Sequence, residues 1–201
     1  MLTLALGLTG ILLLAWFLSP DGRTRVERLG ALRALWLAPV ALLLQVPLLR
    51  GWWTREIAAG LLMTSYVLLL VFVWLNRTSR PILLMGIGLA LNLLVIVANG
   101  GFMPVSPETL SRIVPEVPTD EWRIGVIHRG SKDIVLLRNQ TRLWFLSDVL
   151  VLPPPWPWPS AFSIGDVLVF AGFVWLCWQA FLKPTPTSSH RMKGEASHVS
   201  S

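Results

Sequence analysis

The chain has 201 residues, of which 54% are apolar and only 14% are charged. This composition is too apolar for a soluble domain of that length and is typical of an integral membrane protein. The net charge of +6 is unevenly placed: residues 21–33, 77–80 and those from 183 onward carry nine Lys/Arg and three Asp/Glu, whereas residues 100–162 carry six of each. This distribution fits the positive-inside rule of membrane proteins and argues against a basic face for nucleic acid.

Five apolar segments in chain order predict an all-α integral membrane fold with five transmembrane helices. Each segment is close to the length that crosses a hydrocarbon layer of about 30 Å at about 1.5 Å per residue. The predicted helices span residues 2–18, 35–49, 57–75, 82–98 and 167–182. Residues 1–183 then form a single membrane domain, and the polar tail 184–201 is expected to be disordered on the cytoplasmic side.

The orientation follows from the first apolar segment, residues 2–18. A secretory signal peptide is the alternative, but no Lys or Arg precedes the apolar run and no small-x-small site ends it. A retained helix with its N-terminus outside is favoured because the basic stretch 23–33 follows it. Five spans then place the C-terminus in the cytoplasm.

Several residues mark helix ends or irregularities. Pro39 and Pro47 remove backbone donors in the second helix, which should be kinked or locally irregular. Thr54 is the expected N-cap of the third helix, and Pro81 suits the first turn of the fourth.

The last helix begins with Ser163 and Asp166 in the S-x-x-D spacing of a capping box, so a cap is favoured over a catalytic role for Asp166. Gly86 and Ala90 form a small-xxx-small pair, which either lets another helix approach closely or reflects ordinary glycine usage. The polar residues inside the spans are expected to hydrogen-bond between helices. They are Gln45, Thr64, Ser65, Tyr66 and Asn92.

The long connection at 99–162 is predicted to be an ordered extracytoplasmic cap. Asn99-Gly100-Gly101 should end the fourth helix, and Ser106-Pro107-Glu108 should start a short helix that stops before Pro115. Residues 124–128 and 133–137 flank Gly130-Ser131 and are expected to pair as a hairpin.

The second half of this connection is strongly apolar, and residues 134–152 have to be considered as a sixth span. Arg138, Arg142 and Asp148 would each be costly in mid-bilayer, so the segment is expected to be interfacial or packed over the helix ends. Within it, residues 141–148 form a short amphipathic piece. Residues 153–159, which alternate proline with Trp156 and Trp158, are expected to form a stiff extended strap at headgroup level.

Four stretches carry a family resemblance: NGGFMPVSPE after the fourth apolar segment, GSKDIVL, TRLWFLSD, and FSIGDVL at the last helix. Together they resemble a bacterial multi-pass membrane family known only as a domain of unknown function. The resemblance covers roughly residues 1–183. It implies a bacterial plasma-membrane protein and supplies no catalytic residues.

No recognised catalytic or cofactor motif is present in the sequence. The three histidines show no metal-ligand spacing, so neither a metal nor another cofactor is predicted. The single cysteine, Cys177, lies inside an apolar segment where its thiol should stay protonated. Whether the protein is an enzyme is left open, and the missing motifs favour a non-enzymatic role.

Six polar residues of the loop and its junctions form the candidate ligand-binding set. One hypothesis is that they converge above the helices and bind an anionic or lipid-headgroup ligand through Lys132 and Arg142. The favoured alternative is that four of them pair with one another and with backbone to fold a cap that has no disulfide, namely Lys132, Asp133, Arg142 and Asp148. The set is Asn99, Lys132, Asp133, Arg142, Asp148 and Asp166.

The sequence is compatible with three functions. The leading hypothesis is an interaction or assembly component of the plasma membrane, in contact with the lipid bilayer and with a membrane protein partner or a second copy of itself. The second is a small membrane enzyme, ligand-binding or transport component that acts on a lipid or lipid-linked substrate at the cap. The third and weakest is the substrate-binding subunit of a modular vitamin transporter.

Overall fold

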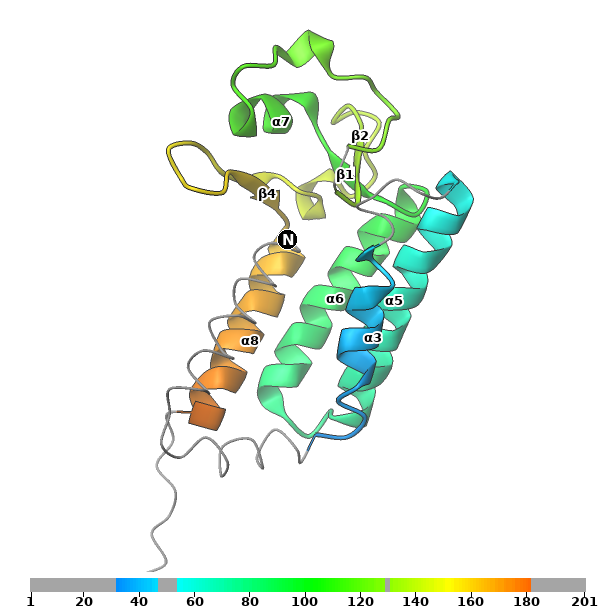
Figure 1. Ribbon diagram of the computed structural model, residues 1–201, viewed down its shortest axis with the longest axis vertical. Helices are drawn as coiled ribbons and strands as arrows, with labels where there is room; N and C mark the ends of the chain where they lie inside the picture. The colour runs from blue at the N-terminus through cyan, green and yellow to red at the C-terminus, as the bar shows by residue number, and fades with distance from the viewer. Residues whose placement is uncertain (1–31, 47–53, 129–130, 182–201) are drawn as a thin grey trace, which may run out of the picture.

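The structure, a computed structural model, describes residues 32–46, 54–128 and 131–181. The predicted first helix and the tail therefore lie outside the described residues. Within them the chain is mostly helical. The described part of the segment 99–163, here called the cap, lies at one end of the helices (Figure 1). The described helices are α3 (Leu37–Leu43), α5 (Arg55–Leu75), α6 (Arg80–Ala98), α7 (Pro107–Ile113) and α8 (Ile164–Phe181).

Helices α5 and α6 are long and apolar enough to cross a membrane. They have 21 and 19 residues, with mean hydropathies of 2.2 and 2.5. Both begin two residues before their predicted starts and end where predicted. Thr54 takes the N-cap position of α5, but its side chain makes no cap hydrogen bond, whereas proline in the first turn of α6 confirms the expected start.

The predicted second helix is described only in part. Helix α3 covers seven residues, and residues 47–53 lie outside the described part. Pro39 is the third residue of α3, inside the first turn, where a backbone N–H has no intrahelical partner to lose. Beyond the helix, Gln45 Nε2 donates to Ser65 Oγ of α5 at 2.9 Å, as expected for polar residues between helices.

Helices α6 and α8 pack together through glycine. A Cβ added at Gly165 would overlap Asn92 Oδ1 and lie 2.6 Å from the Gly88 carbonyl oxygen, so the two backbones are nearly in contact. The predicted small-xxx-small pair is used only in part. Gly86 lies against Val73 of α5, whereas Ala90 is exposed.

The cap contains short strands, so the all-α prediction holds for the helices but is wrong for the cap. β1 (Met103–Val105) pairs in parallel with β2 (Asp133–Val135), and β3 (Leu150–Leu152) pairs antiparallel with β4 (Ser160–Phe162). A three-residue strand carries too little local signal to be recognised without its partner. Neither pair was predicted.

The expected hairpin is present in a reduced form. Ile127 and Ile134 form an antiparallel bridge, and His128 N donates to the Asp133 carbonyl at 2.8 Å. The short helix α7 is confirmed, because Ser106 Oγ accepts from Thr109 N at 3.2 Å and Pro107 takes the first position.

The apolar half of the loop contains no helix of spanning length. Residues 134–152 form the end of β2, the 3-10 turn η2 (Trp144–Leu146) and β3, so a sixth span is excluded. Residues 153–159 form the turn between β3 and β4 and do not run as an extended strap. The strap prediction is therefore wrong, because the pairing of β3 with β4 folds the chain back on itself. Trp156 and Trp158 remain exposed at this turn.

One hydrophobic core joins the cap to the helices. Phe102 and Met103 of the cap are fully buried, and they pack in the same cluster as Leu62 of α5 and Ile96 of α6. Gly100 and Gly101 have φ of +79° and +94°, which turns the chain from α6 into this core as expected. The cap is therefore held in a defined position on the helix ends.

Candidate functional site

Polar side chains gather where the cap meets α5, α6 and α8; most of them are buried, and Lys132 and Asp133 are half-buried. Ordinarily such groups are fully hydrogen-bonded, and each that is not requires an explanation. We call the set the junction cluster. It consists of Tyr66, Asn92, Lys132, Asp133, Asp148, Ser163 and Asp166.

The α8 side of the cluster is a closed hydrogen-bond network. Ser163 Oγ accepts from Asp166 N at 3.0 Å while Asp166 Oδ2 accepts from Ser163 N at 3.1 Å, which confirms the predicted capping box. Asn92 of α6 adds two bonds: its Nδ2 donates to Asp166 Oδ1 at 2.7 Å, and its Oδ1 accepts from Ser163 Oγ at 2.7 Å. Asp166 therefore caps the N-terminus of α8 and also joins α8 to α6 by a hydrogen bond.

The cap supplies Lys132, which reaches α5. Its Nζ donates to Tyr66 Oη at 3.2 Å and lies 5.8 Å from the centre of the Tyr66 ring. Side chains on a helix lean toward its N-terminus, and the N-terminal end of α5 is the end beneath the cap. The Tyr66 side chain therefore points toward Lys132 of the cap.

Strand β1 positions the other two acids. Asp133 is the register partner of Met103, and Asp148 N donates to the Pro104 carbonyl oxygen at 3.3 Å. The Asp148 side chain is only 1% exposed, and its Oδ1 has no hydrogen-bond partner; Asp133 Oδ1 is also buried without one. These two oxygens distinguish the cap side of the cluster from the satisfied α8 side.

The charges of the cluster act on one another. Burial, the largest influence on Lys132, disfavours its ammonium, but the attraction of Tyr66 and of the carboxylates of Asp166, Asp148 and Asp133 outweighs burial and raises the pKa of Lys132 well above its usual value. Lys132 is therefore charged at neutral pH.

The carboxyls of the cap respond in the opposite sense. Burial raises the pKa of Asp148 well above its usual value, the nearby charge of Asp133 adds to this, and Lys132 opposes it. Burial also raises the pKa of Asp133, against the effects of Lys132 and Ser131. Both carboxyls are thus held toward their protonated forms.

The predicted set divides in two. Lys132, Asp133, Asp148 and Asp166 lie close enough for their charges to interact. Asn99 and Arg142 contact each other elsewhere: Asn99 Oδ1 accepts from Arg142 N, and Asn99 Nδ2 donates to the Arg142 carbonyl, both at 2.9 Å. Arg142 is exposed, and the two bonds use its backbone N–H and carbonyl and not its guanidinium.

Three members of the cluster were absent from the predicted ligand-binding set. Tyr66 and Asn92 were expected only as interhelical partners, and Ser163 only as a helix cap. The available signal was their position: a polar residue inside an apolar span, or at its cap, needs a partner from another segment. The sequence does not say which segment supplies it.

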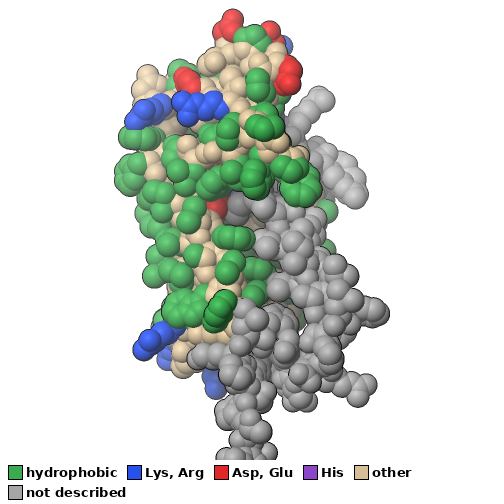
Figure 2. Space-filling view, turned by 90° about the vertical axis from the view of Figure 1, so that its left-hand side faces the viewer, with side chains coloured by type: hydrophobic (Ala, Val, Ile, Leu, Met, Phe, Trp, Pro, Cys, Tyr) green, Lys and Arg blue, Asp and Glu red, His purple; other side chains and the backbone are tan. Residues whose placement is uncertain are grey.

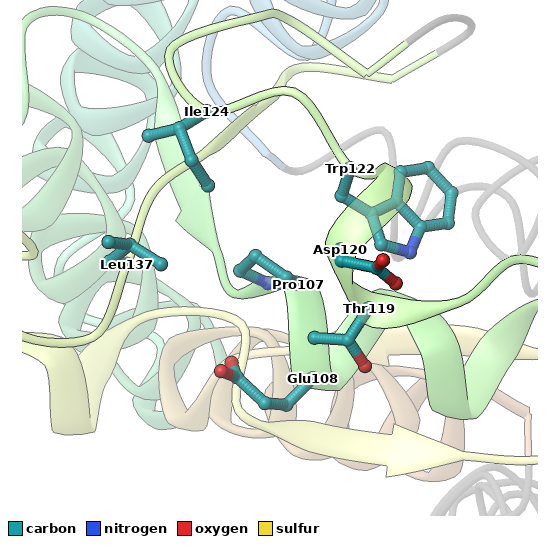
Figure 3. A pocket seen from close by; sticks show the side chains of 7 residues that line it. All are labelled: Pro107, Glu108, Thr119, Asp120, Trp122, Ile124 and Leu137. Atoms are coloured by element: carbon teal, nitrogen blue, oxygen red, sulfur yellow. The ribbon is translucent and has the colours of Figure 1, made fainter.

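The cap also carries an open groove on its outer surface, of about 380 Å³ (Figure 3). Ile124 and Leu137 lie on one side of Pro107, and Trp122 with Asp120 lies on the other. Its acidic residues, Glu108 and Asp120, are exposed, so water satisfies them. The buried, unpartnered carboxyls of the junction cluster are the stronger indication of a ligand, and none of the predicted residues lines this groove.

The arrangement can bind hydrogen-bonding groups and can hold or release protons. Within the described residues, no group of three or more His, Cys, Asp or Glu side chains is arranged to hold a metal ion. The cluster combines a charged lysine, a phenol and carboxyls of raised pKa where the cap meets the helices. Raised carboxyl pKa values are typical of functional sites, although structural networks also produce them.

Comparison with known proteins gives one assignment. No curated protein and no solved structure matches the chain. A family model described as a family of unknown function (DUF5317) matches residues 30–178, which include the four described strands, the whole junction cluster and the described helices except the last three residues of α8. The chain therefore belongs to the DUF5317 family.

Proposed function

We propose that the protein is a multi-pass protein of the bacterial plasma membrane with five spans, an external N-terminus, a cytoplasmic C-terminus and an extracytoplasmic cap. Helices α5 and α6 support this by length and composition, and α8 is also strongly apolar. Figure 2 shows hydrophobic side chains along the helices; on this face, Lys and Arg lie without Asp or Glu at the end away from the cap, whereas the cap carries side chains of both charges. Arg77 lies between α5 and α6, Arg80 is the first residue of α6, and Arg33 is bonded through its backbone to Asn76 at the same end.

Thiol labelling of intact cells tests this topology. In a Cys177→Ala background, Thr119→Cys places a thiol on the cap and Thr78→Cys places one between α5 and α6, both at exposed positions. A membrane-impermeant maleimide should label position 119 in intact cells and position 78 only after permeabilisation. Labelling of both from the same side would reject the topology.

Within this frame, we propose that the junction cluster binds a ligand, so that the protein is a ligand-binding or transport component, or a small membrane enzyme, acting on a lipid or lipid-linked substrate. The observation that carries the proposal is the pair of buried, unpartnered carboxyl oxygens on Asp133 and Asp148 beside a charged lysine. A cluster that served only to fold the cap would pair these atoms, because an unpaired buried polar group costs about 1–3 kcal/mol.

Mass spectrometry of co-purifying small molecules and lipids tests this function. The full chain is purified in mild detergent as wild type, as Asp148→Asn and as the matched control Asp120→Asn, which changes an exposed acid elsewhere on the cap. Wild type and Asp120→Asn should retain the same ligand, and Asp148→Asn should lose it while keeping the same elution profile. Identical ligand content in all three would reject the cluster as the site.

A role as an interaction or assembly component is the second candidate. It is favoured by large apolar side chains exposed on the cap, away from the spans: Ile124, Val126, Trp144 and Phe145 are 40–50% exposed. Such side chains are enriched in interfaces with a partner protein or a second copy. Cross-linking in native membranes should then give a discrete adduct that Phe145→Ser removes, and ligand retention should be unchanged in that variant.

A further inference from the structure

The buried atoms without partners in the described residues are all oxygens. They are Asp133 Oδ1, Asp148 Oδ1 and Ser160 Oγ, and no buried side-chain nitrogen of the described residues is in this state. An ionised carboxylate only accepts hydrogen bonds. A ligand that binds Asp133 and Asp148 in their ionised forms must therefore bring hydrogen-bond donors.

The balance of charge points in the same direction. Three carboxyls, those of Asp133, Asp148 and Asp166, act electrostatically on one ammonium, that of Lys132, which already donates to Tyr66. Arg142, the other cation expected to hold an anion, is exposed and bonded through its backbone to Asn99. A phosphate placed here would face carboxylates, whereas a cationic donor would be attracted to them.

We propose that the junction cluster binds the primary ammonium group of an amine ligand, such as the headgroup of phosphatidylethanolamine, through Asp148 and Asp133. This inference rests on the ligand-binding function proposed above and specifies the class of ligand. The cluster lies where the cap meets the helices, which is the level of a lipid headgroup if the helices span the membrane. A primary ammonium offers three N–H donors, enough for both unpartnered carboxyls.

Proton exchange accompanies this binding. Burial and the nearby charge of Asp166 raise the pKa of Asp148 and Asp133, while Lys132, which is hydrogen-bonded to Tyr66, opposes the rise, so both carboxyls are held toward their protonated forms before a ligand binds. An ammonium that enters needs the ionised carboxylate, and the proton it replaces leaves to solvent. Affinity should therefore rise with pH until the carboxyl is ionised in the empty site, or until the amine itself loses its proton.

A series of methylated headgroups tests the proposal. The purified full chain in detergent is titrated with short-chain phosphatidylethanolamine, its N-methyl and N,N-dimethyl forms, and phosphatidylcholine. These lipids share glycerol and phosphate and differ by one N–H donor at each step. Affinity should fall along the series, by about tenfold or more from the first member to the last, the loss expected for removing charge-assisted hydrogen bonds. Phosphatidylglycerol should bind no better than phosphatidylcholine.

Competition by free ethanolamine distinguishes a lipid headgroup from a soluble amine as the source of the ammonium group. If ethanolamine competes with the lipid at millimolar concentration, the ammonium alone is recognised, and a soluble amine is the ligand when it binds tighter than the lipid. If only the lipid binds and the methylation series holds, the ligand is the lipid headgroup. Both outcomes support the ammonium site.

Two variants distinguish an ammonium site from an anion site. Asp148→Asn should weaken binding of phosphatidylethanolamine about tenfold or more, while Asp120→Asn should leave it unchanged. Lys132→Met removes the competing cation at similar length, so it should preserve or tighten ammonium binding. An anion site would lose binding in that variant.

The outcomes separate the two proposals. Equal affinity across the methylation series, or tightest binding of phosphatidylglycerol with loss in Lys132→Met, would overturn the ammonium inference and leave ligand binding at the cluster standing. Absence of binding by every lipid and by ethanolamine, together with no co-purified ligand sensitive to Asp148→Asn, would overturn both.

Discussion

Substitution of Gly165 by alanine tests how closely the cluster depends on the crossing of α6 and α8. Gly165 is the second residue of α8, and a Cβ there would overlap Asn92 Oδ1 and lie 2.6 Å from the carbonyl oxygen of Gly88. The Gly88 carbonyl belongs to the α6 backbone and cannot rotate away. The Gly165→Ala variant must therefore separate the two helices or displace the Asn92 amide.

The cost has two parts. Overpacking at a close contact destabilises by about 1–3 kcal/mol. Displacing Asn92 also breaks the buried bond that its Oδ1 accepts from Ser163 Oγ at 2.7 Å, which costs about 1–3 kcal/mol more. Alanine regains about 0.5–1 kcal/mol of helix propensity. With the middle value of each range the net loss is about 3 kcal/mol, and at about 2–4 °C per kcal/mol for a chain of this size the melting temperature should fall by about 6–12 °C.

The single cysteine of the chain provides the assay. Cys177 lies partly buried on α8, so a thiol-reactive dye added to detergent-solubilised protein reports its exposure on heating. Gly60→Ala is the matched control, because a Cβ at Gly60 in α5 meets no atom within 4 Å. This control should melt at or slightly above the wild-type temperature. Melting of Gly165→Ala within about 2 °C of wild type, below the range worked above, would refute the close-packing argument, as would an equal loss in Gly60→Ala.

Three further predictions concern the cap. Asp148→Asn should flatten the pH dependence of stability, because the folded wild-type protein keeps this carboxyl protonated at a pH where the unfolded chain has already ionised. Wild-type stability should therefore fall as pH rises from about 4 through the raised pKa of the folded state. Melting temperatures of the two proteins that change in parallel over this range would contradict the prediction. Asn99→Ala removes both side-chain bonds to the Arg142 backbone, so limited trypsinolysis after Arg142 should accelerate severalfold, while Asn139→Ala at an exposed position should behave as wild type. Ser106→Ala deletes the α7 N-cap and should lower cap stability by about 1 kcal/mol, measured as faster amide exchange in α7; unchanged exchange would show that the cap hydrogen bond is not needed.

Features that depend on neighbouring residues could be predicted from the sequence. The end of α6 at Ala98, the start of α7 at Pro107 and the capping box of α8 all follow from residues within one turn of each other. The sequence also identified four of the residues whose charges interact at the junction, because ionisable groups next to apolar spans are costly and few. The bonding partner of each could not be predicted in this way.

The tertiary structure decided which residues meet. Lys132 reaches Tyr66, 66 positions away, and Asn92 reaches Asp166, 74 positions away. The parallel pairing of β1 with β2 sets Asp133 opposite Met103, although both strands are too short to be recognised alone.

Periodicity, capping and turn signals act within a few residues, so they fix helices and their ends. Contacts across 66 or 74 positions depend on how whole elements pack. The close approach at Gly88 and the burial of Phe102 under the cap set that packing, and with it the position of every carboxyl in the junction cluster. The amino-acid sequence therefore determined where the chain is apolar and where its helices end, and the packing of the cap on the helices determined that four ionisable residues come together at the junction.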